Sequence, residues 1–503
     1  MTYDDESFEP QYEIYYKNGT VRAFPSPNSD LPEIVDIPSN ISTVINSAWT
    51  NINNAGGGKI HVRRYIYSPN SGFDFSNSSN ITLKCDYGTK FKFTSLASTV
   101  SAIRPNSTQE TAMMRYDNST YLTFENLYFD LSGMTTKQNG TYANTHSYIS
   151  FKRCTIDTAV VAIWDDGISS DVTYEKCQVL HWQSGGDGVF APALTASCTH
   201  SRYKFVRCEF IDNSGEGGDD AIALDLGIDL WYDSNYFDKG TTTNSGPGSC
   251  INSIGSNDVH IINNKCKGGN ASAIFVQGNQ SYQSPIGNLR VDVSGNICVS
   301  NIQASGNTTR SVIEVEASQF VNVHDNQIIT PAYGYFLGDE TINATTTGYN
   351  RYVNNLCITA ATGTFYRNYV AGTTVSAYPE IVDNEGCPNA LITSTFPTTS
   401  VAGSGGVSNA VNFVLPANKV LTVISLAGQS SDVGGGGHTT LRLQNITDGV
   451  TIASLVIDTN GEYSVDNRIA QVTYTANKSL GVQVINTDSS ALNCSGVIVM
   501  NIN

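Results

Sequence analysis

The chain repeats one short pattern three times, as Phe151-Lys-Arg-Cys154, Tyr174-Glu-Lys-Cys177 and Phe205-Val-Arg-Cys208. Later copies turn on an asparagine instead, and these asparagines follow one another after 32, 30 and 29 residues: Asn264, Asn296, Asn326 and Asn355. Because a period near 30 carries no helical stripe here, each copy is interpreted as one coil of short strands whose inward side chains only stacking can bury. The repeat predicts a right-handed parallel β-helix.

Composition supports an almost entirely β chain. Of the 503 residues, 40% are hydrophobic and only 15% charged, and the 44 glycines accompany abundant Asn, Ser and Thr, which favour strands and turns. The repeated cysteines, with Cys357, lie in apolar strand-like contexts, which favours buried thiols over disulfides. The turn asparagines are predicted to be scaffold, because they tolerate a left-handed backbone and can hydrogen-bond their copies in neighbouring coils.

Two elements are predicted ahead of the repeat. Residues 1–37 are expected to form an arm with one hairpin over 12–24, since Asn18-Gly19 accepts the positive φ of a tight turn. A helix is predicted at 39–55, with Ser39 as its N-cap and a one-sided apolar stripe. Such a helix can cover the open end of the first coil, which would otherwise expose apolar surface and unpaired backbone.

The rest of the chain divides into two parts by residue composition and pattern. A parallel β-helix, including the capping helix, is expected over 38–392. Beyond it the sequence becomes rich in Thr, Ser and Gly and then shows alternating strands, which predicts a β-sandwich over 393–503. We expect that second domain to serve trimerisation or glycan binding.

Charge and hydropathy argue against several classes of partner. The chain carries 45 acidic against 28 basic residues, a formal charge of −17, which disfavours binding to nucleic acid. No apolar run approaches the roughly 20 residues of a membrane span, so membrane insertion is not expected. The acidic start, Met1-Thr-Tyr-Asp-Asp-Glu6, does not have the pattern of a secretory signal peptide. No cofactor and no metal ion is expected.

Three acidic clusters follow the repeated cysteines at nearly one offset of eleven, ten and eleven residues. They are Trp164-Asp165-Asp166-Gly167, Gly186-Asp187-Gly188 and Gly218-Asp219-Asp220-Ala221. Equal offsets on successive coils would place these carboxylates about 4.8 Å apart, which is the spacing of neighbouring strands. The clusters are therefore predicted to form one acidic patch.

A close pair of carboxylates suits the cleavage of glycosidic bonds. At an effective dielectric of about 20, two charges roughly 5 Å apart repel by on the order of 3 kcal/mol, or about two pKa units. One carboxyl then keeps its proton near neutral pH while the other stays ionised, as an inverting glycoside hydrolase requires. The predicted catalytic residues are Asp187, Asp219 and Asp220. Further acids and aromatic faces can bind sugar, which makes the predicted substrate contacts Asp165, Asp166, Trp164, His181, Trp182 and Glu216.

Three alternatives compete with catalysis by these acids. Aspartates in β-helix turns can serve backbone hydrogen bonding, an acidic ladder can hold Ca²⁺, and a β-helix can be an adhesin without catalysis. If clefts lie between subunits, the acids could also come from a later coil, for example Glu314 and Glu316.

The second and third clusters resemble successive motifs of the polygalacturonase family of glycoside hydrolases. The family's middle motif, Asp-Asp-Cys-Ile-Ala-Ile, is matched here by Asp219-Asp-Ala-Ile-Ala-Leu224. The resemblance implies that the first Asp of this motif, Asp219, is the general acid. It also implies that the second, Asp220, activates water together with Asp187 of the preceding coil.

Two departures from that family argue against a polygalacturonate substrate. The family's Gly-His-Gly motif is Gly246-Pro247-Gly248 in this chain. Its Arg-x-Lys substrate clamp has no match in the corresponding stretch, Ser272-Ala-Ile-Phe-Val-Gln277. A polygalacturonate substrate is therefore not expected.

The layout of the whole chain resembles bacteriophage tailspikes, which contain a pectin-lyase-like β-helix. In that group an N-terminal arm, a capping helix, a β-helix and a C-terminal β-sandwich form a trimer that degrades bacterial capsule or lipopolysaccharide. The resemblance implies a homotrimeric, extracellular depolymerase of the virion tail that binds a host surface polysaccharide. A non-catalytic glycan-binding fibre and a secreted pectin-type hydrolase or lyase are the alternatives, and a lyase would need a cationic base near the acids.

Overall fold

The structure is a computed structural model of the chain, which divides into two compact units, 1–270 with 281–283 and 271–280 with 284–503. The residues that it describes are 9–27, 29–36, 40–94, 97–103, 109–135, 138–182, 186–192, 199–212, 219–240, 248–268, 272–278, 289–299, 311–330, 335–342, 350–359, 364–371, 380–382, 384, 391–401, 406–415, 420–430, 439–457, 464–466, 470–476, 478–487 and 492–502. Within these ranges, no helix has the length and apolar character needed to cross a membrane.

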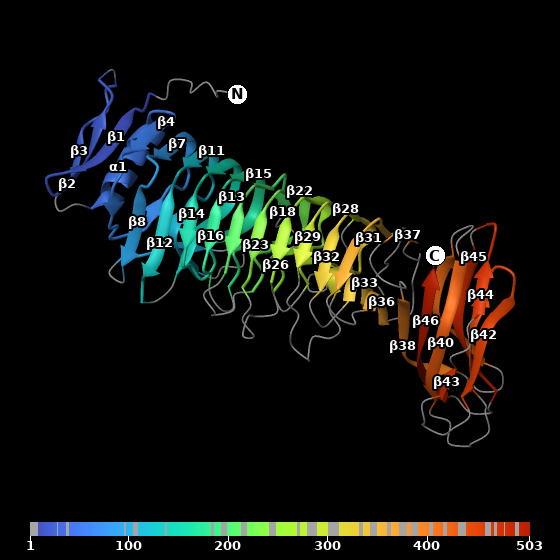
Figure 1. The fold of residues 1–503 in the computed structure, drawn as a ribbon. Helices are drawn as coiled ribbons and strands as arrows, with labels where there is room; N and C mark the ends of the chain where they lie inside the picture. The colour runs from blue at the N-terminus through green and yellow to red at the C-terminus, as the bar shows by residue number, and fades with distance from the viewer. Residues whose placement is uncertain are drawn as a thin grey trace. The chain divides into compact units, whose positions relative to one another are not determined.

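The first unit begins with a small antiparallel ribbon (Figure 1). Strands β1 (Tyr12–Lys17) and β2 (Thr20–Pro25) form the predicted hairpin, and both residues of its Asn18-Gly19 turn have positive φ. Strand β3 (Ile34–Asp36) pairs with β2, and β1 pairs in parallel with β4 (Gly58–Val62), the first strand of the coils. The ribbon is therefore continuous with the coiled sheet.

Helix α1 (Ile41–Asn54) follows the ribbon and buries its whole apolar stripe. It begins slightly later than predicted, because Asn40 is the N-cap and its side chain accepts a backbone N–H of the first turn at 3.1 Å. The predicted cap, Ser39, lies outside the described residues. The indole of Trp49, 2% exposed, donates to the Ser78 hydroxyl at 2.8 Å, which joins the helix to an early coil.

Each coil of the first unit contributes strands to three faces, and the strands of one face pair in parallel. The first face contains β6 (Phe73–Asp74), β10 (Gln109–Arg115), the first halves of β13 (Asn139–Lys152) and β15 (Ile163–Glu175), β17 (Val189–Ala191), β21 (Ile222–Asp225) and β24 (Ile251–Ile254), with β9 (Val100–Ile103) antiparallel to β10. The second face contains β4, β7 (Ser79–Cys85), β11 (Thr120–Glu125), the second halves of β13 and β15, β18 (Thr199–Ser201), β19 (Lys204–Val206), β22 (Gly227–Asp233) and β25 (Asn257–Ile262). The third face contains β5 (Ile66–Tyr67), β8 (Lys90–Thr94), β12 (Tyr128–Gly133), β14 (Thr155–Asp157), β16 (Gln178–Leu180), β20 (Glu209–Ile211), β23 (Tyr236–Asp238) and β26 (Lys265–Lys267).

The predicted fold class, a right-handed parallel β-helix, is confirmed by this arrangement. Its interior is filled by side chains stacked from coil to coil. Ring centroids lie 4.9 to 5.6 Å apart along one column of buried aromatics: Phe124, Phe151, Tyr174, Phe205 and Tyr232. Neighbouring coils thus bury each other's apolar surface, which no coil could do alone.

The repeated cysteines occupy one interior corner, between the second and third faces. The described cysteines are free and buried, as predicted, and the Cys177 thiol donates to the Phe151 carbonyl of the preceding coil at 3.4 Å. In the next coils an asparagine takes over this position. The Asn235 side-chain amide donates to the Phe205 carbonyl at 2.9 Å, and its Oδ1 accepts the Cys208 backbone N–H at 2.8 Å. Both the side-chain amide and the backbone N–H of Asn235 donate to Asn264 Oδ1. The asparagine ladder is therefore scaffold, as expected.

One part of the asparagine prediction is wrong. The left-handed residue is not the ladder asparagine but the residue before it, for example Ser234 (φ 58°) before Asn235 and Asn263 (φ 57°) before Asn264. The same holds at the cysteine corners, where Lys176 (φ 54°) precedes the thiol. The sharp bend thus belongs to an outward-facing residue, and this leaves the following side chain free to point inward.

The second unit has the same coil plan. Its parallel strands are β27 (Ile274–Gln277), β30 (Ser311–Glu316), β33 (Tyr335–Ile342) and β36 (Thr364–Ala371), then β28 (Leu289–Ser294), β31 (Gln319–His324), β34 (Arg351–Val353) and β37 (Glu380–Val382), and β29 (Ile297–Val299), β32 (Gln327–Thr330) and β35 (Leu356–Thr359). Their corner carries a second asparagine ladder of the same geometry, with amide-to-amide distances of 2.8 to 2.9 Å: Asn296, Asn326, Asn355 and Asn384.

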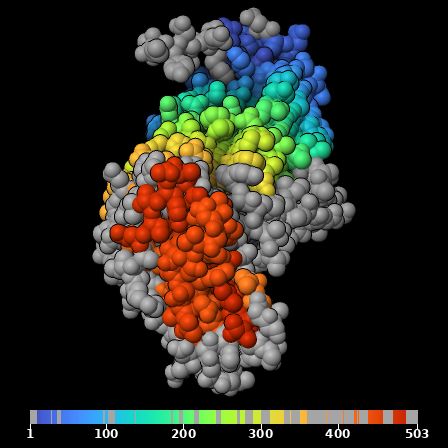
Figure 2. Space-filling model, turned by 90° about the vertical axis from the view of Figure 1, so that its right-hand side faces the viewer, coloured from blue at the N-terminus to red at the C-terminus, as the bar shows by residue number. Residues whose placement is uncertain are grey.

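Two antiparallel sheets end the second unit, and Figure 2 shows their orange-to-red surface. One contains β38 (Leu391–Val401), β46 (Leu492–Ile502), β40 (Val420–Ser430), β43 (Ser464–Asp466) and β44 (Ala470–Thr473), and the other contains β39 (Gly406–Leu415), β45 (Lys478–Asn486), β41 (Thr439–Asn445) and β42 (Val450–Ile457). Strand β38 also pairs in parallel with β36, so it crosses the boundary predicted at 392. The division into domains stays a prediction.

Candidate active site

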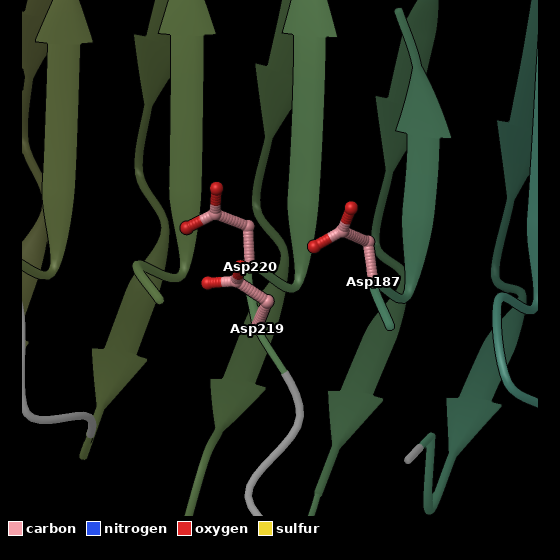
Figure 3. A group of neighbouring side chains, drawn as sticks. All are labelled: Asp187, Asp219 and Asp220. Atoms are coloured by element: carbon pink, nitrogen blue, oxygen red, sulfur yellow. The ribbon is translucent and has the colours of Figure 1, made fainter. Parts of the chain in front are cut away.

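Asp187, Asp219 and Asp220 lie together on the first unit. Each sits in a connection that leads from the third face to the first: Asp187 two residues before β17, and the other two just before β21. One oxygen from each carboxylate lies within 4.8 Å of the others. Figure 3 shows Asp187 and Asp220 side by side on neighbouring coils, with Asp219 next to Asp220. The connections 183–185 and 213–218, which precede these acids in sequence, lie outside the described residues.

The register explains which acids meet. Val189 pairs with Ile222, so Asp187 stands level with Asp220, and the Gly188 N–H donates to the Asp220 carbonyl at 3.0 Å. The following coil packs tightly beneath them, since a Cβ on Gly248 would lie 2.2 Å from the Asp219 carbonyl carbon. Only glycine fits there, and its approach fixes the backbone that carries two of the three acids.

Asp220 is held as an oriented carboxylate. It is 8% exposed, its Oδ1 accepts the backbone N–H of Ser249, and its Oδ2 accepts the side-chain amide of Asn252 at 2.8 Å. Both donors come from the next coil, at the start of β24. Hydrogen bonds to both oxygens favour the ionised form of the group.

A buried lysine adds a positive charge to the acidic group. Lys239, directly after β23, is 1% exposed, and its ammonium donates to the backbone carbonyl of Asp219. Its charge acts to lower the pKa of both Asp187 and Asp220. Sequence reasoning missed Lys239 and Asn252, because no motif marks them and only the register of neighbouring coils places them beside the acids.

The two level carboxyls differ in proton affinity. Burial, followed by the negative charges of Asp220 and Asp219, raises the pKa of Asp187 to about 9. Burial also raises the pKa of Asp220, but Lys239 and the hydrogen bonds from Asn252 and Ser249 counteract it, and the pKa stays at about 6. Near neutral pH the pair therefore holds one proton, on Asp187, while Asp220 is mainly ionised.

The first predicted cluster does not join this site, which corrects the prediction of one acidic patch. Ile163 pairs with Val189, so Asp165 stands level with Ala191, four residues beyond the level of Asp187. The reason is that the connection before β15 (158–162) is shorter than the one before β17 (181–188). Equal offsets from the corner cysteine therefore do not mean equal positions in the coils.

Asp165 points into the coil interior and is fully buried, so it cannot contact substrate as predicted. It accepts the Tyr203 hydroxyl at 2.6 Å and lies 3.5 Å from His146 Nε2. The same network continues from Tyr203 to the Ser169 hydroxyl at 2.6 Å and on to His200 Nδ1 at 2.8 Å. The hydroxyl hydrogen bonds from Tyr203 and Tyr116 reach both oxygens of Asp165, and this explains how a carboxylate is accommodated in the core.

The other predicted substrate contacts differ in burial and position. Asp166 and Trp182 are fully buried, which corrects the prediction that they touch sugar directly. His181 is partly exposed, but its Nδ1 lies 2.9 Å from Asp157 on the third face. Trp164 is half-buried on the first face. Glu216 lies outside the described residues, as does Pro247.

The alternative acids of the later coil are also buried. Glu314 and Glu316, on β30, are 0% and 2% exposed, and the Ser272 hydroxyl donates to Glu314. A buried glutamate of this kind has no access to a polysaccharide within its own chain. Their participation in a cleft between subunits stays a prediction.

The three aspartates could in principle hold a cation, since their oxygens converge. Calcium, however, prefers about six to eight oxygen ligands. Both oxygens of Asp220 already accept hydrogen bonds, and the Lys239 ammonium already places a positive charge at the group. The donor set therefore fits Ca²⁺ poorly and suits proton transfer better.

The chain is similar in fold to several solved structures, although no protein-family model and no curated protein matches it. The Dettilon tailspike protein is 13% identical with a TM-score of 0.43, and the alignment covers 92% of this chain and 91% of that one. A tailspike double mutant of E. coli bacteriophage HK620 is 12% identical with a TM-score of 0.41, over 92% and 90%. An exopolygalacturonase from Thermotoga maritima is 9% identical with a TM-score of 0.38, over 68% and 88%. At these values the likeness assigns no activity to the chain.

Proposed function

We propose that the protein is a glycoside hydrolase that cleaves a bacterial surface polysaccharide, either a capsule or a lipopolysaccharide. The supporting observation is the pair formed by Asp187 and Asp220. These carboxyls stand at one level of neighbouring coils, and their pKa values of about 9 and about 6 keep one protonated and one ionised at neutral pH. A proton donor beside an ionised carboxylate is the combination that glycosidic cleavage uses.

In the proposed reaction Asp187 gives its proton to the glycosidic oxygen as the leaving sugar departs. Asp220, oriented by Ser249 and Asn252, takes a proton from the attacking water. This assignment differs from the one implied by the polygalacturonase resemblance, where Asp219 is the acid. We prefer Asp187 because burial and two neighbouring charges raise its pKa to about 9, which keeps the proton available.

Direct attack of an activated water, with protonation of the leaving oxygen, is the inverting course. Inverting enzymes separate their two carboxyl groups by about 6.5–9.5 Å, and retaining enzymes by about 5–5.5 Å. The oxygens here lie within 4.8 Å, so the distance does not favour inversion. Inversion stays a prediction, and proton NMR of the first product would test it by the anomer that appears before mutarotation.

The choice of substrate rests on the layout of the chain. An N-terminal ribbon, a helix over the first coil, parallel coils and two antiparallel sheets follow one another in the order that tailspikes are expected to have. We therefore propose an extracellular role in a virion tail, with a host surface polysaccharide as the ligand. A non-catalytic glycan-binding fibre and a pectin-type hydrolase or lyase are the competing functions.

Release of reducing ends separates these functions. Purified capsules, purified lipopolysaccharides and polygalacturonate are incubated with wild type, with Asp220→Asn and with Asp187→Asn. We expect release from a capsule or lipopolysaccharide and a loss of about a hundredfold or more in either variant, the usual size of a general acid or base contribution. The control is Asp258→Asn on β25, which should act like wild type.

Other outcomes would favour the competing functions. Release from polygalacturonate alone would favour the pectin-type enzyme, and binding without release would favour the fibre. Unchanged rates in Asp187→Asn and Asp220→Asn would remove these acids from the mechanism. Because the site fits Ca²⁺ poorly, activity is expected to survive chelation with EDTA, and its abolition would restore the metal alternative.

A further inference from the structure

A row of side chains leads away from the catalytic aspartates along the first face. Strand register places one residue of each coil level with the next: Tyr142, Trp164, Phe190, Ala223 and Asn252. Each step along the row is one strand spacing, about 4.8 Å. The row begins at Asn252, whose amide binds Asp220 at 2.8 Å, and it becomes aromatic toward the earlier coils.

The aromatic part of the row begins beside the acids. Ala223 follows Asp220 on the same coil and contributes only a methyl group to the row. Phe190 follows Asp187 on its coil by three residues, and Trp164 is its neighbour on the coil before. Both rings are half-buried and partly open to solvent, whereas Tyr142 beyond them is fully buried.

The indole of Trp164 is fixed in place. Its Nε1 donates to Asp166 Oδ1 at 3.2 Å, and the Tyr142 hydroxyl donates to Asp166 Oδ2 at 3.0 Å. The indole also packs edge-on to the Phe190 ring, with centroids 5.3 Å apart at 74°, and against buried Tyr142. A ring held this way loses little conformational freedom when a ligand covers it.

This contact explains how the Asp166 carboxylate can be buried. A fully buried carboxylate is costly unless its oxygens are hydrogen-bonded, and here both oxygens accept from aromatic side chains of the row. Asp166 thus acts on the ligand through Trp164, as a positioning residue, although it cannot touch sugar itself.

We propose that Phe190 and Trp164 form a binding site for the polysaccharide chain on the side of the acids that faces the earlier coils. Binding sites of this type combine aromatic surface with a few oriented polar groups, and the acids supply the polar end. This proposal rests on the proposed function for the nature of its ligand. It adds the direction of the bound chain and the residues that hold it.

The chain offers a matched control for Trp164. Trp231 is also half-buried, and its Nε1 also donates to an aspartate two residues away, Asp229, at 2.7 Å. It lies on the second face, stacked on His260 with centroids 4.0 Å apart. Removal of Trp231 therefore changes a comparable tryptophan outside the proposed site.

Affinity gel electrophoresis tests the proposal, with the same purified capsules, lipopolysaccharides and polygalacturonate embedded in the gel. Trp164→Ala and Phe190→Ala are measured beside Trp231→Ala, each in the wild-type and in the Asp220→Asn chain. We expect about tenfold weaker retention for Trp164→Ala and Phe190→Ala, the loss typical of a buried contact residue, and wild-type retention for Trp231→Ala. Asp166→Asn should weaken retention less than Trp164→Ala, because asparagine keeps one acceptor for the indole.

The outcomes separate this proposal from the proposed function. If the wild type hydrolyses the polysaccharide and the gel retains Trp164→Ala and Phe190→Ala as strongly as wild type, the binding site would be overturned and the hydrolase would remain. Retention that depends on Trp164 and Phe190, without any release of reducing ends, would keep the binding site and overturn the hydrolase. Equal losses in Trp164→Ala and Trp231→Ala, or no retention of any polysaccharide by wild type, would overturn the site.

Discussion

Lys239 is the residue whose removal should change the chemistry of the site most selectively. Its positive charge lowers the pKa of both Asp187 and Asp220, so replacement by methionine should raise both values. The limb of the pH–rate profile on the acid side, set by ionisation of Asp220 at about 6, should then move up by about one pH unit. The measurement is kcat/KM against pH for wild type and Lys239→Met.

Lys239→Arg keeps the charge and serves as the control, so its profile should stay near that of wild type. A profile that moves to lower pH in Lys239→Met, or does not move, would contradict the electrostatic role. Methionine fills a similar volume but leaves the Asp219 carbonyl without its donor and Asp220 without its counter-charge, so the profile is measured below the melting temperature of the variant.

The raised pKa of Asp187, which keeps a proton available for catalysis, should also lower the stability of the folded protein at alkaline pH. An ordinary aspartate titrates near 3.8, while the folded chain holds the pKa of Asp187 at about 9, so between these values the folded state binds the proton and the unfolded state does not. Stability should therefore fall as the pH rises from about 4 to about 9. Asp187→Asn removes this dependence and should stabilise the protein at pH 8 by about 1–2 kcal/mol, with little effect at pH 4.5.

Thermal melts at the two pH values test this, with Asp258→Asn as the control. A variant that is less stable than wild type at pH 8 would show that the charge of Asp187 is better compensated than its surroundings indicate. Asp187→Asn should also lose activity, so this one substitution would raise stability and remove function.

The motifs predicted which carboxylates meet but not the contacts that set their pKa values. Gly-Asp-Gly and Asp-Asp-Ala mark Asp187, Asp219 and Asp220, since each follows a third-face strand in its coil. The sequence could not place Lys239 or Asn252, because their effect depends on contacts with other coils. It also misplaced Asp165, because offsets along the chain ignore the length of the connection in between.

The period of the repeat was enough to predict the fold. Inward side chains must alternate and stack, so a chain with apolar residues at fixed corners and a period near 30 has few other ways to bury them. Register was not predictable to the same degree, because connections between the third and first faces vary in length from coil to coil. The site lies in those connections, so the variable part of the coil determines the chemistry.

The asparagine ladder should carry a measurable part of the stability of the second unit. Asn326 is 1% exposed; its Oδ1 accepts from the backbone and the amide of Asn296 at 2.9 Å, and its amide donates to the Val293 carbonyl at 2.8 Å. Asn326→Ala leaves these groups buried without partners and should cost about 1–3 kcal/mol. Asn322→Ala, on the outward side of β31, is the control. Urea melts should separate the two variants, and equal stability would contradict the ladder's role.

At the scale of the whole molecule, the C-terminal sheets carry the prediction of a trimer. The outer strands of the four-stranded sheet, β39 and β42, expose valines that an isolated chain would leave in water: Val407 at 52%, Val450 at 55% and Val456 at 45%. Apolar side chains on edge strands favour association, and we expect copies of the chain to cover them in a homotrimer. Light scattering should then give three times the 54.1 kDa of one chain.

A double variant, Val450→Lys with Val456→Lys, should lower that mass while the β signal in circular dichroism persists. Val35→Lys, on β3 and 45% exposed, should not. A monomeric wild type, or a double variant that keeps the mass of wild type, would exclude this sheet as the contact between copies.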